Sequence, residues 1–215
     1  MATILDKSGS VFNHFIAEIR DAKIQQDPIR FRRNMERIGE VMAYEISKKL
    51  EFETFETQTP LGIATTSRVK SQVVLATILR AGLPLHSGML NYFDHAQNAF
   101  VSAYRKHHKD NSFEIQIEYL SCPDLNGKTL IITDPMLATG SSMVLAYQAL
   151  IKRGTPKEIH IASVIASRQG LEYCKKNLPA NVKFWLGSLD EELTAHSYIV
   201  PGLGDAGDLA YGEKI

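Results

Sequence analysis

Continuous apolar runs are the feature that most limits what this chain can fold into. Five of them occur after residue 72: VVLATIL (73–79), AFVSAY (99–104), TLIIT (129–133), IHIASVIAS (159–167) and VKFWLG (182–187). A strand that is apolar on both faces needs helices packed on both faces. Helical patterns lie between several of the runs, at 143–152 and 171–177. This alternation predicts an α/β fold with a mostly parallel, twisted sheet flanked by helices, and with ligands at the carboxyl ends of the strands.

A different pattern occurs at 113–119, where FEIQIEY alternates between apolar and charged or polar residues. A period of two predicts an antiparallel strand with one solvated face. The polar stretch KHHKDN (106–111) links this strand to the preceding apolar run. We therefore expect a β-hairpin over 105–120 that projects from the sheet.

The first 50 residues show helical patterns. Asp27 and Pro28 are the residue types expected at an N-cap and at the first helical position, and apolar residues then recur every three or four positions to Leu50. A shorter helix is expected around 11–24. We expect these helices to form a scaffolding extension, 1–50, of a single domain that comprises residues 1–215.

The segment FETFETQT (52–59), which follows this extension, has strand-forming residues without clean alternation. Pro60, Leu61 and Gly62 come next and are typical of a turn. We expect one short strand here, followed by the turn.

The charge balance argues against several classes of partner. Lysine plus arginine and aspartate plus glutamate both number 24, so no basic field favours a nucleic acid or an anionic membrane surface. Any anionic ligand must therefore be held locally.

Two cysteines, Cys122 and Cys174, lie far apart and outside any metal-binding spacing, so we expect buried free thiols. The N-terminus carries Asp6 and Lys7 where a signal peptide would be apolar, and no run of about 18 apolar residues occurs. We expect a cytoplasmic enzyme or binding protein.

The segment TLIITDPMLATGSSMV (129–144) has the strongest chemical signature. Its buried strand is predicted to end at Asp134, and a short loop through Thr139 and Gly140 leads into a helix. Backbone N–H groups and hydroxyls at the positive end of a helix form a site for a phosphate monoester. Gly140 would permit a close approach of the phosphate, and Asp134 would accept hydrogen bonds from neighbouring hydroxyls. A phosphate beside vicinal hydroxyls indicates a ribose 5-phosphate.

The residues of this region also allow two other interpretations, a simple helix cap and a Walker A loop. Ser141 or Ser142 could simply cap the helix, which is common for serine alone but less so for the whole string from Asp134 to Ser142. Gly127-Lys128-Thr129 resembles the end of a Walker A loop, but Cys122 occupies the position of the first glycine and the segment precedes its strand. We interpret Asn126-Gly127 as a turn.

A glycine-rich segment near the C-terminus, GLGDAG (202–207), matches the dinucleotide-binding pattern G-x-G-x-x-G. That fingerprint requires a following helix and an acidic residue about 20 positions later. Only eight residues follow Gly207, so these glycines serve another purpose.

Four motifs together resemble the uracil phosphoribosyltransferase family. They are ILRAG (78–82), Tyr104-Arg105, DPMLATGSS (134–142) and YIVPGLGDAGD (198–208), in the family's order and at suitable intervals. The resemblance extends from about Ile78 to Gly212, and the last motif is specific to the uracil enzymes. It implies a phosphoribosyltransferase-like fold and the reaction of uracil with 5-phosphoribosyl 1-pyrophosphate (PRPP) to give UMP and pyrophosphate, with Mg²⁺ on the sugar substrate.

The resemblance also implies roles for individual residues on the PRPP side. Arg80 and Arg105 would bind the diphosphate across the cleft, where a guanidinium can contact two oxygens. Asp205 would assist them, through the hydrated magnesium ion. The ribose 5-phosphate would be held by Asp134, Pro135, Met136, Leu137, Ala138, Thr139, Gly140, Ser141 and Ser142.

On the uracil side, the resemblance implies that the C-terminal segment 198–215 binds the base. Its contacts would be Ile199, Gly204, Asp205 and Ala206, with the main chain reading the acceptor–donor–acceptor edge of uracil. We expect Tyr198, Pro201 and Tyr211 to anchor the segment against the fraying common at chain ends.

Some features depart from the family pattern. Lys106, His107, His108 and Lys109 stand where an acidic, threonine-containing loop is expected, Ser141 replaces a glycine, and the ending YGEK is atypical. We interpret 106–109 as a solvated hairpin tip. The family favours a homodimer or larger assembly. Alternatives are a regulatory nucleotide-binding protein of the same fold without turnover, and a phosphoribosyltransferase for another base.

Overall fold

The computed structural model describes residues 2–107 and 113–213; the side chains of 103–116 lie outside this description. The main sheet has seven strands in the order β1-β9-β8-β7-β4-β5-β6. All neighbouring pairs are parallel except β5 and β6. The strands are β1 (Ala2–Ile4), β4 (Val73–Leu79), β5 (Gln97–His107), β6 (Phe113–Ser121), β7 (Thr129–Leu137), β8 (Glu158–Ser167) and β9 (Lys183–Asp190). The predicted mostly parallel sheet is confirmed.

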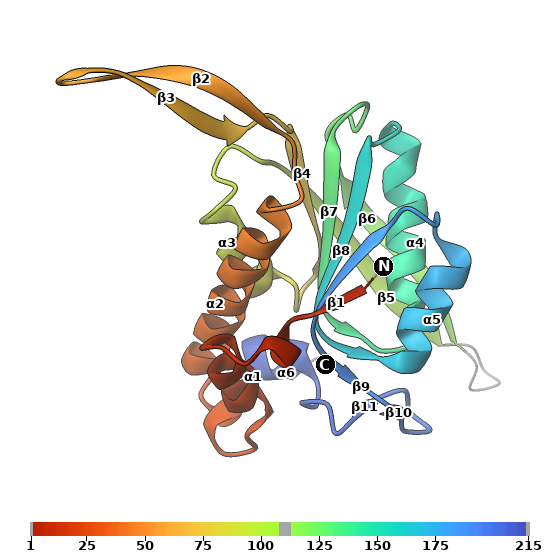
Figure 1. Ribbon diagram of the computed structural model, residues 1–215. Coiled ribbons are helices and arrows are strands. Elements are labelled where there is room, and N and C mark those ends of the chain that lie inside the picture. The colour runs from red at the N-terminus through yellow and green to blue at the C-terminus, as the bar shows by residue number, and fades with distance from the viewer. Residues whose placement is uncertain (1, 108–112, 214–215) are drawn as a thin grey trace.

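Helices cover both faces of this sheet (Figure 1). On one side lie α4 (Ser141–Leu150) and α5 (Arg168–Asn177), which pack on β7 and β8 through a core that includes Leu150, Ile161 and Leu171. The other side is covered by α1 (Phe12–Arg20), α2 (Pro28–Ser47), α3 (Leu83–Leu90) and α6 (Ala206–Tyr211). Short 3-10 helices occupy Leu5–Ser8, Ile24–Gln26 and Ile151–Arg153. Apolar side chains on both faces of the strands explain this layering.

The N-terminal helices agree with the prediction. Asp27 caps α2 by accepting hydrogen bonds from the N–H groups of Ile29 and Arg30, at 2.9 and 3.2 Å. The predicted apolar stripe of α2 is buried against the sheet. Strand β1 was not predicted, because three residues, Ala2–Ile4, show no period and become a strand only by pairing with β9.

Among the described residues, two antiparallel hairpins have more than two residue pairs, and one of them was predicted. The expected pairing over 105–120 is the β5–β6 pair, and residues 103–107 of β5 pair with β6 alone, because β4 ends opposite Ser102. The second hairpin consists of β2 (Phe52–Thr59) and β3 (Gly62–Val69), and it extends away from the body of the protein (Figure 1). The predicted strand at 52–59 and the turn after it are confirmed, but β3 was not predicted, because it is held by its partner and not by any apolar pattern of its own.

The two cysteines are free thiols, as predicted, although only Cys174 is fully buried and Cys122 is partly exposed. Among the described residues, no helix is both long and apolar enough to cross a membrane.

Candidate active site

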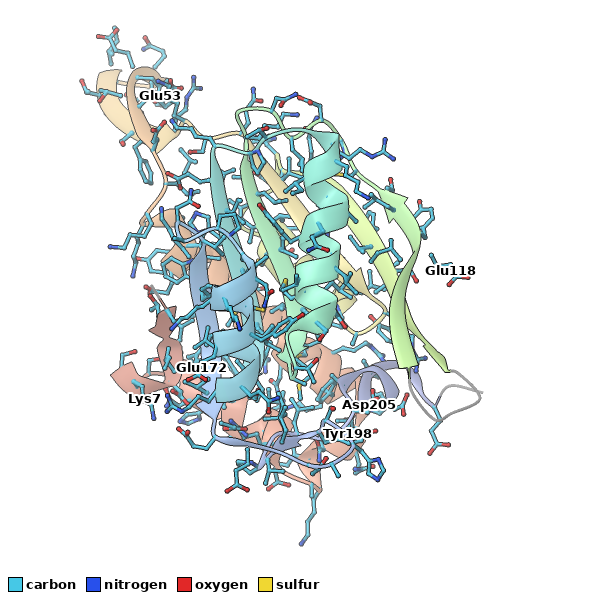
Figure 2. The ribbon with its side chains drawn as sticks, turned by 90° about the vertical axis from the view of Figure 1, so that its right-hand side faces the viewer. Lys7, Glu53, Glu118, Glu172, Tyr198 and Asp205 are labelled. Carbon is cyan, nitrogen blue, oxygen red and sulfur yellow. The ribbon has the colours of Figure 1, made fainter. Side chains whose placement is uncertain are left out.

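One cavity, of about 230 Å³, lies at the carboxyl ends of β4 and β7. Residues 134–140 line one part of it together with Ser142 and Met143, and residues 197–199 and 204–207 line another. Two segments that are about 60 positions apart in the sequence therefore share a single hollow. Figure 2 shows Asp205 and Tyr198 together at the end of the molecule where α4 begins, opposite the hairpin that carries Glu53.

The phosphate loop of residues 134–142 is tighter than predicted. Strand β7 does not end at Asp134 but continues to Leu137, because Met136 and Leu137 pair with β8. Helix α4 follows after three residues, and Gly140 at its N-cap has a φ of +80°. No serine side chain caps the helix, so the simple capping interpretation is wrong. The first turn of α4 presents backbone N–H groups without helical acceptors to the cavity.

The structure gives a steric reason for glycine at position 140 in addition to the predicted close approach of a phosphate. A Cβ atom at this position would lie 2.7 Å from the carbonyl oxygen of Gly170 and 2.9 Å from Cys174 Sγ, both on α5. The direction in which a side chain of residue 140 would point is thus blocked by α5, and a side chain there would push the loop away from α5. The positive φ adds a second penalty for any other residue.

Helix α5 supports the phosphate loop from behind. Ser167 caps α5 by accepting a hydrogen bond from Gly170 N at 2.8 Å, and its hydroxyl donates to the carbonyl oxygen of Ala138 at 2.5 Å. Sequence reasoning missed this residue. Its signal was a serine directly after a buried strand and before a helix, which is an N-cap pattern.

Asp134 lies within the cavity with one weak local partner. The N–H of Met136 donates to Asp134 Oδ1 at 3.5 Å. Burial raises the pKa of Asp134 from its ordinary value to about 7, because the surrounding protein disfavours the ionised carboxylate. Hydroxyl donors of a ligand would reverse this effect.

The C-terminal segment is folded onto the protein. Ile199, Leu203 and Ala206 are each at most 4% exposed and belong to the core beneath α1 and α2. By contrast, Tyr198 and Tyr211 are 48% and 40% exposed, so the prediction that tyrosines anchor the segment was wrong. Strand β11 (Ile199–Val200) also pairs with β10 (Glu192–Leu193), and the Val200–Pro201 peptide bond is cis.

Asp205 has a structural contact as well as a place in the cavity. Its Oδ1 atom accepts hydrogen bonds from the N–H groups of Gly207 and Asp208, at 2.8 and 3.0 Å, and so caps α6. The second carboxylate oxygen, Oδ2, takes no part in these bonds. The predicted contacts Ile199, Gly204 and Ala206 line the same cavity.

Arg80 lies at the edge of the site. Leu79 and Ala81 line the cavity, whereas the Arg80 guanidinium is directed toward α6, where Nη2 donates to Asp208 Oδ1 at 2.9 Å and to the carbonyl oxygen of Gly212 at 2.7 Å. The Leu79–Arg80 peptide bond is cis. In this arrangement Arg80 holds α6 in place.

The comparisons with known proteins agree on one family. Residues 7–213 match the family model described as uracil phosphoribosyltransferase. The chain is 60% identical over 206 residues to a uracil phosphoribosyltransferase of Porphyromonas gingivalis, and the match covers 96% of this chain and 95% of the relative. The corresponding protein of Pyrococcus furiosus is 37% identical, with 93% of this chain and 85% of the relative covered.

This chain belongs to the uracil phosphoribosyltransferase family.

The fold of this family member is similar to that of two solved structures. A protein from Aquifex aeolicus is 30% identical, superimposes with a TM-score of 0.88 and covers both chains fully. A hypoxanthine phosphoribosyltransferase from Staphylococcus aureus, 16% identical, shares the fold at a TM-score of 0.51 over 74% of each chain. The predicted fold class and the resemblance from the sequence are confirmed.

Two predicted features of this family member lie partly outside the described residues. Arg105 is on β5 opposite Ile115, but its side chain is outside the description. The side chains of 106–109 are likewise outside it, so the interpretation of this stretch as a solvated tip stays a prediction.

The carboxylates in the cavity of this family member are too few to bind Mg²⁺ without ligands from a substrate. Among the residues whose side chains are described, 2–102 and 117–213, no group of three or more histidine, cysteine, aspartate or glutamate side chains could hold a metal ion. Asp134 and Asp205 both line the cavity. Mg²⁺ is commonly bound by one or two carboxylates together with waters and substrate phosphates, so this donor set fits an ion that enters with an anionic substrate.

Proposed function

We propose that this chain transfers the phosphoribosyl group of PRPP to uracil, giving UMP and pyrophosphate. The carrying observation is that the phosphate loop and the C-terminal segment line one cavity. A phosphate site alone is common to phosphoribosyltransferase-like folds. The second segment lines the same cavity, which supports a base site beside the site expected for ribose.

The phosphate loop supplies the sugar side of the site. Backbone N–H groups at the start of α4 bind the 5-phosphate, and the hydroxyls of Thr139, Ser141 and Ser142 lie close to the same helix end. Asp134 accepts hydrogen bonds from the ribose hydroxyls in its ionised form. The phosphate anion needs no surface charge to attract it, because the helix end stabilises it locally.

The C-terminal segment supplies the base side. Gly204 itself has no side chain to fill the cavity, and its φ is +92°. Main-chain groups of Ile199 and Gly204–Ala206 therefore match the donor and acceptors of uracil.

Catalysis then follows from placement and charge. The bond from C1 of the ribose to the diphosphate oxygen breaks and the electron pair leaves with pyrophosphate, while N1 of uracil forms the new bond on the opposite face and its proton passes to water or to the departing pyrophosphate. Positive charge that develops on the ribose is stabilised by the carboxylates of Asp134 and Asp205. Arg80 and Arg105 stabilise the departing diphosphate, which requires Arg80 to exchange a contact with α6 for the ligand. Asp205, together with the substrate phosphates, would hold Mg²⁺, which would supply further positive charge there.

The remaining expectations complete the proposal. The chain acts in the cytoplasm on small molecules, without a nucleic-acid or membrane partner, and forms a homodimer or larger assembly. Its balanced charge, 24 basic and 24 acidic residues, supports the absence of a polyanionic partner.

The test is direct. Purified protein, PRPP, Mg²⁺ and radiolabelled uracil should yield labelled UMP and one equivalent of pyrophosphate. Unlabelled orotate, hypoxanthine and cytosine should compete poorly. Absence of UMP at every protein concentration would favour a regulatory nucleotide-binding protein instead, and efficient competition by another base would identify a different substrate. Omission of Mg²⁺ with added EDTA should abolish product formation if the ion is required.

A further inference from the structure

The N-terminal helix α1 reaches the C-terminal segment through one arginine. The guanidinium of Arg20, at the last position of α1, binds Asp190 with both carboxylate oxygens engaged: Nη1 to Oδ2 and Nη2 to Oδ1, each at 2.8 Å. Nη2 also donates to Ser188 Oγ at 2.9 Å. The side chains are well shielded, with exposures of 20% for Arg20 and 7% for Asp190.

Arg20 and Asp190 together hold both backbone groups of Gly202. Arg20 Nη1 donates to the carbonyl oxygen of Gly202 at 2.9 Å, and the N–H of Gly202 donates to Asp190 Oδ2 at 2.9 Å. Gly202 has a φ of +56°, a conformation that glycine adopts readily and other residues do not. The two hydrogen bonds with Arg20 and Asp190 hold the turn in this conformation. We call these two residues the Arg20–Asp190 clamp.

A second contact from the same region reinforces the turn. With the amide of Gln25 oriented to satisfy its neighbours, its nitrogen donates to the carbonyl oxygen of Leu203 at 2.8 Å and to that of Ile19 at 3.1 Å. Leu203 is followed by Gly204, which lines the cavity. Gly202, which the clamp holds, is thus only two residues before Gly204, the nearest predicted uracil contact in this direction.

The clamp differs from two other arginine–carboxylate pairs that involve two hydrogen bonds each. Arg30 binds Glu18 through two hydrogen bonds of 2.7 Å, and Arg168 binds Glu191 in the same two-pronged manner. Neither of those arginines has a hydrogen bond to the C-terminal segment. Such exposed pairs contribute little, whereas removing one partner of a shielded, hydrogen-bonded pair leaves the other charge without compensation.

We propose that Arg20 and Asp190 are positioning residues for uracil: they fix the Gly202 turn, so that Ile199 and Gly204–Ala206 present their main-chain groups at the correct place over the ribose. Neither residue lines the cavity, and their effect passes through the backbone of the segment. The inference rests on the proposed function and adds to it a role for the N-terminal extension in recognising the base.

The experiment compares Arg20→Met, Arg20→Lys and Asp190→Asn with the unaltered enzyme and with Arg30→Met as the matched control. Arg30→Met removes a two-pronged pair between α1 and α2 but leaves Gly202 untouched. We expect Arg20→Met to raise the KM for uracil at least tenfold while the KM for PRPP stays within twofold. Arg20→Lys, which keeps a donor for the Gly202 carbonyl oxygen, should recover part of this loss. Asp190→Asn should fall between them.

Hydrogen exchange provides the second readout and covers variants that fold poorly. In Arg20→Lys and Asp190→Asn, amides of residues 199–207 should exchange faster while those of 134–143 do not change; Arg30→Met should alter neither. An unchanged KM for uracil in Arg20→Met, an equal rise in both KM values, or the same effect in Arg30→Met would overturn the inference. An inactive unaltered enzyme would instead overturn the proposed function, and the exchange rates of 199–207 would then decide whether the clamp fixes the turn.

Discussion

The two halves of the active site are held in opposite ways. The phosphate loop is a nine-residue segment, 134–142, that runs from the end of β7 into the first turn of α4. The residues that support it, Ser167 and Gly170, belong to the next strand and helix, β8 and α5. The C-terminal segment, by contrast, has only short elements, β11 and α6, and depends on α1 and the end of β9. The proposed sugar half is therefore local in sequence, and the proposed base half is supported by residues from both ends of the chain.

This difference suggests a division of labour. A site for the phosphate can be kept by preserving one strand, one loop and one helix. A site that reads a particular base is held by contacts that can change without altering the phosphate loop. Substitutions in each half should accordingly affect one substrate more than the other.

The largest effect is expected from Gly140→Val in the phosphate loop. Valine at a positive φ and against Gly170 and Cys174 of α5 carries a penalty of roughly 4 kcal/mol, which displaces the loop and lowers kcat/KM for PRPP by about 1,000-fold. Steady-state kinetics will measure it. Gly127→Val is the matched control, because Gly127 also has a positive φ but has nothing within 4 Å of an added Cβ. Equal losses of activity in both variants would show that strain, and not the loop position, is responsible.

Asp205→Ala should have the next largest effect, because Asp205 links the two halves. The change removes a carboxylate from the cavity and the cap of α6, and we expect kcat to fall by about 100-fold. Asp205→Asn retains a capping oxygen and separates the two losses. If Asp205→Asn were fully active, the charge would have no part in catalysis.

Gly202→Ala tests the base half alone. The added Cβ would lie 2.1 Å from the carbonyl oxygen of Ile199, so the turn must shift. We expect the KM for uracil to rise by about 30-fold, equivalent to roughly 2 kcal/mol of lost binding, with little change in the KM for PRPP. A rise confined to PRPP would contradict the assignment of this segment to the base.

A smaller effect concerns pH and Asp134, whose pKa is raised to about 7. The ionised form accepts the ribose hydroxyls, so PRPP should bind more tightly as pH rises, and the KM for PRPP should increase about tenfold between pH 8 and pH 6. In Asp134→Asn this dependence should be weaker. A parallel dependence in both proteins would assign the titration to another group.

The unliganded protein should respond to pH in the opposite sense. Because the folded-state pKa of Asp134 lies above its unfolded value of 3.8, the stabilisation by its protonated form is present below that value and is lost as pH rises through about 7. Asp134→Asn should therefore raise the Tm at pH 8 more than at pH 4.

The smallest effect is expected from Ser167→Ala behind the phosphate loop. Loss of the α5 cap and of the bond to Ala138 should lower the free energy of unfolding by about 1 kcal/mol, or the Tm by about 2–4 °C for a chain of this size. Calorimetry will measure the shift. Ser47→Ala, at the exposed end of α2, serves as the control.

Sequence reasoning succeeded where the signal is local. Buried strands such as 73–79 and 159–167 can be predicted from their continuous apolar sequence. The strand, loop and helix of the phosphate site follow one another directly in the sequence, so they could be predicted as a unit. Sequence reasoning failed for β1 and β3, which gain their structure from a partner strand and carry no period of their own.

The support of the base half was equally invisible. Arg20 ends an amphipathic helix and looks like an ordinary surface arginine, and its partner Asp190 is 170 positions away. The sequence does not reveal that Ile199 and Leu203 are buried while Tyr198 and Tyr211, which were predicted as anchors, are exposed. Only the three-dimensional arrangement shows which residues are covered by α1 and α2.

The central claim is that the C-terminal segment holds the base directly beside the ribose phosphate, and a crystal structure of the protein with UMP tests it most directly. We predict the 5-phosphate at the start of α4, within hydrogen-bonding distance of residues 139–142, and the uracil ring against the main chain of Ile199 and Gly204–Ala206, with the Arg20–Asp190 clamp intact. A nucleotide whose base lies away from residues 198–207, or a C-terminal segment detached from α1 while UMP is bound, would contradict the account.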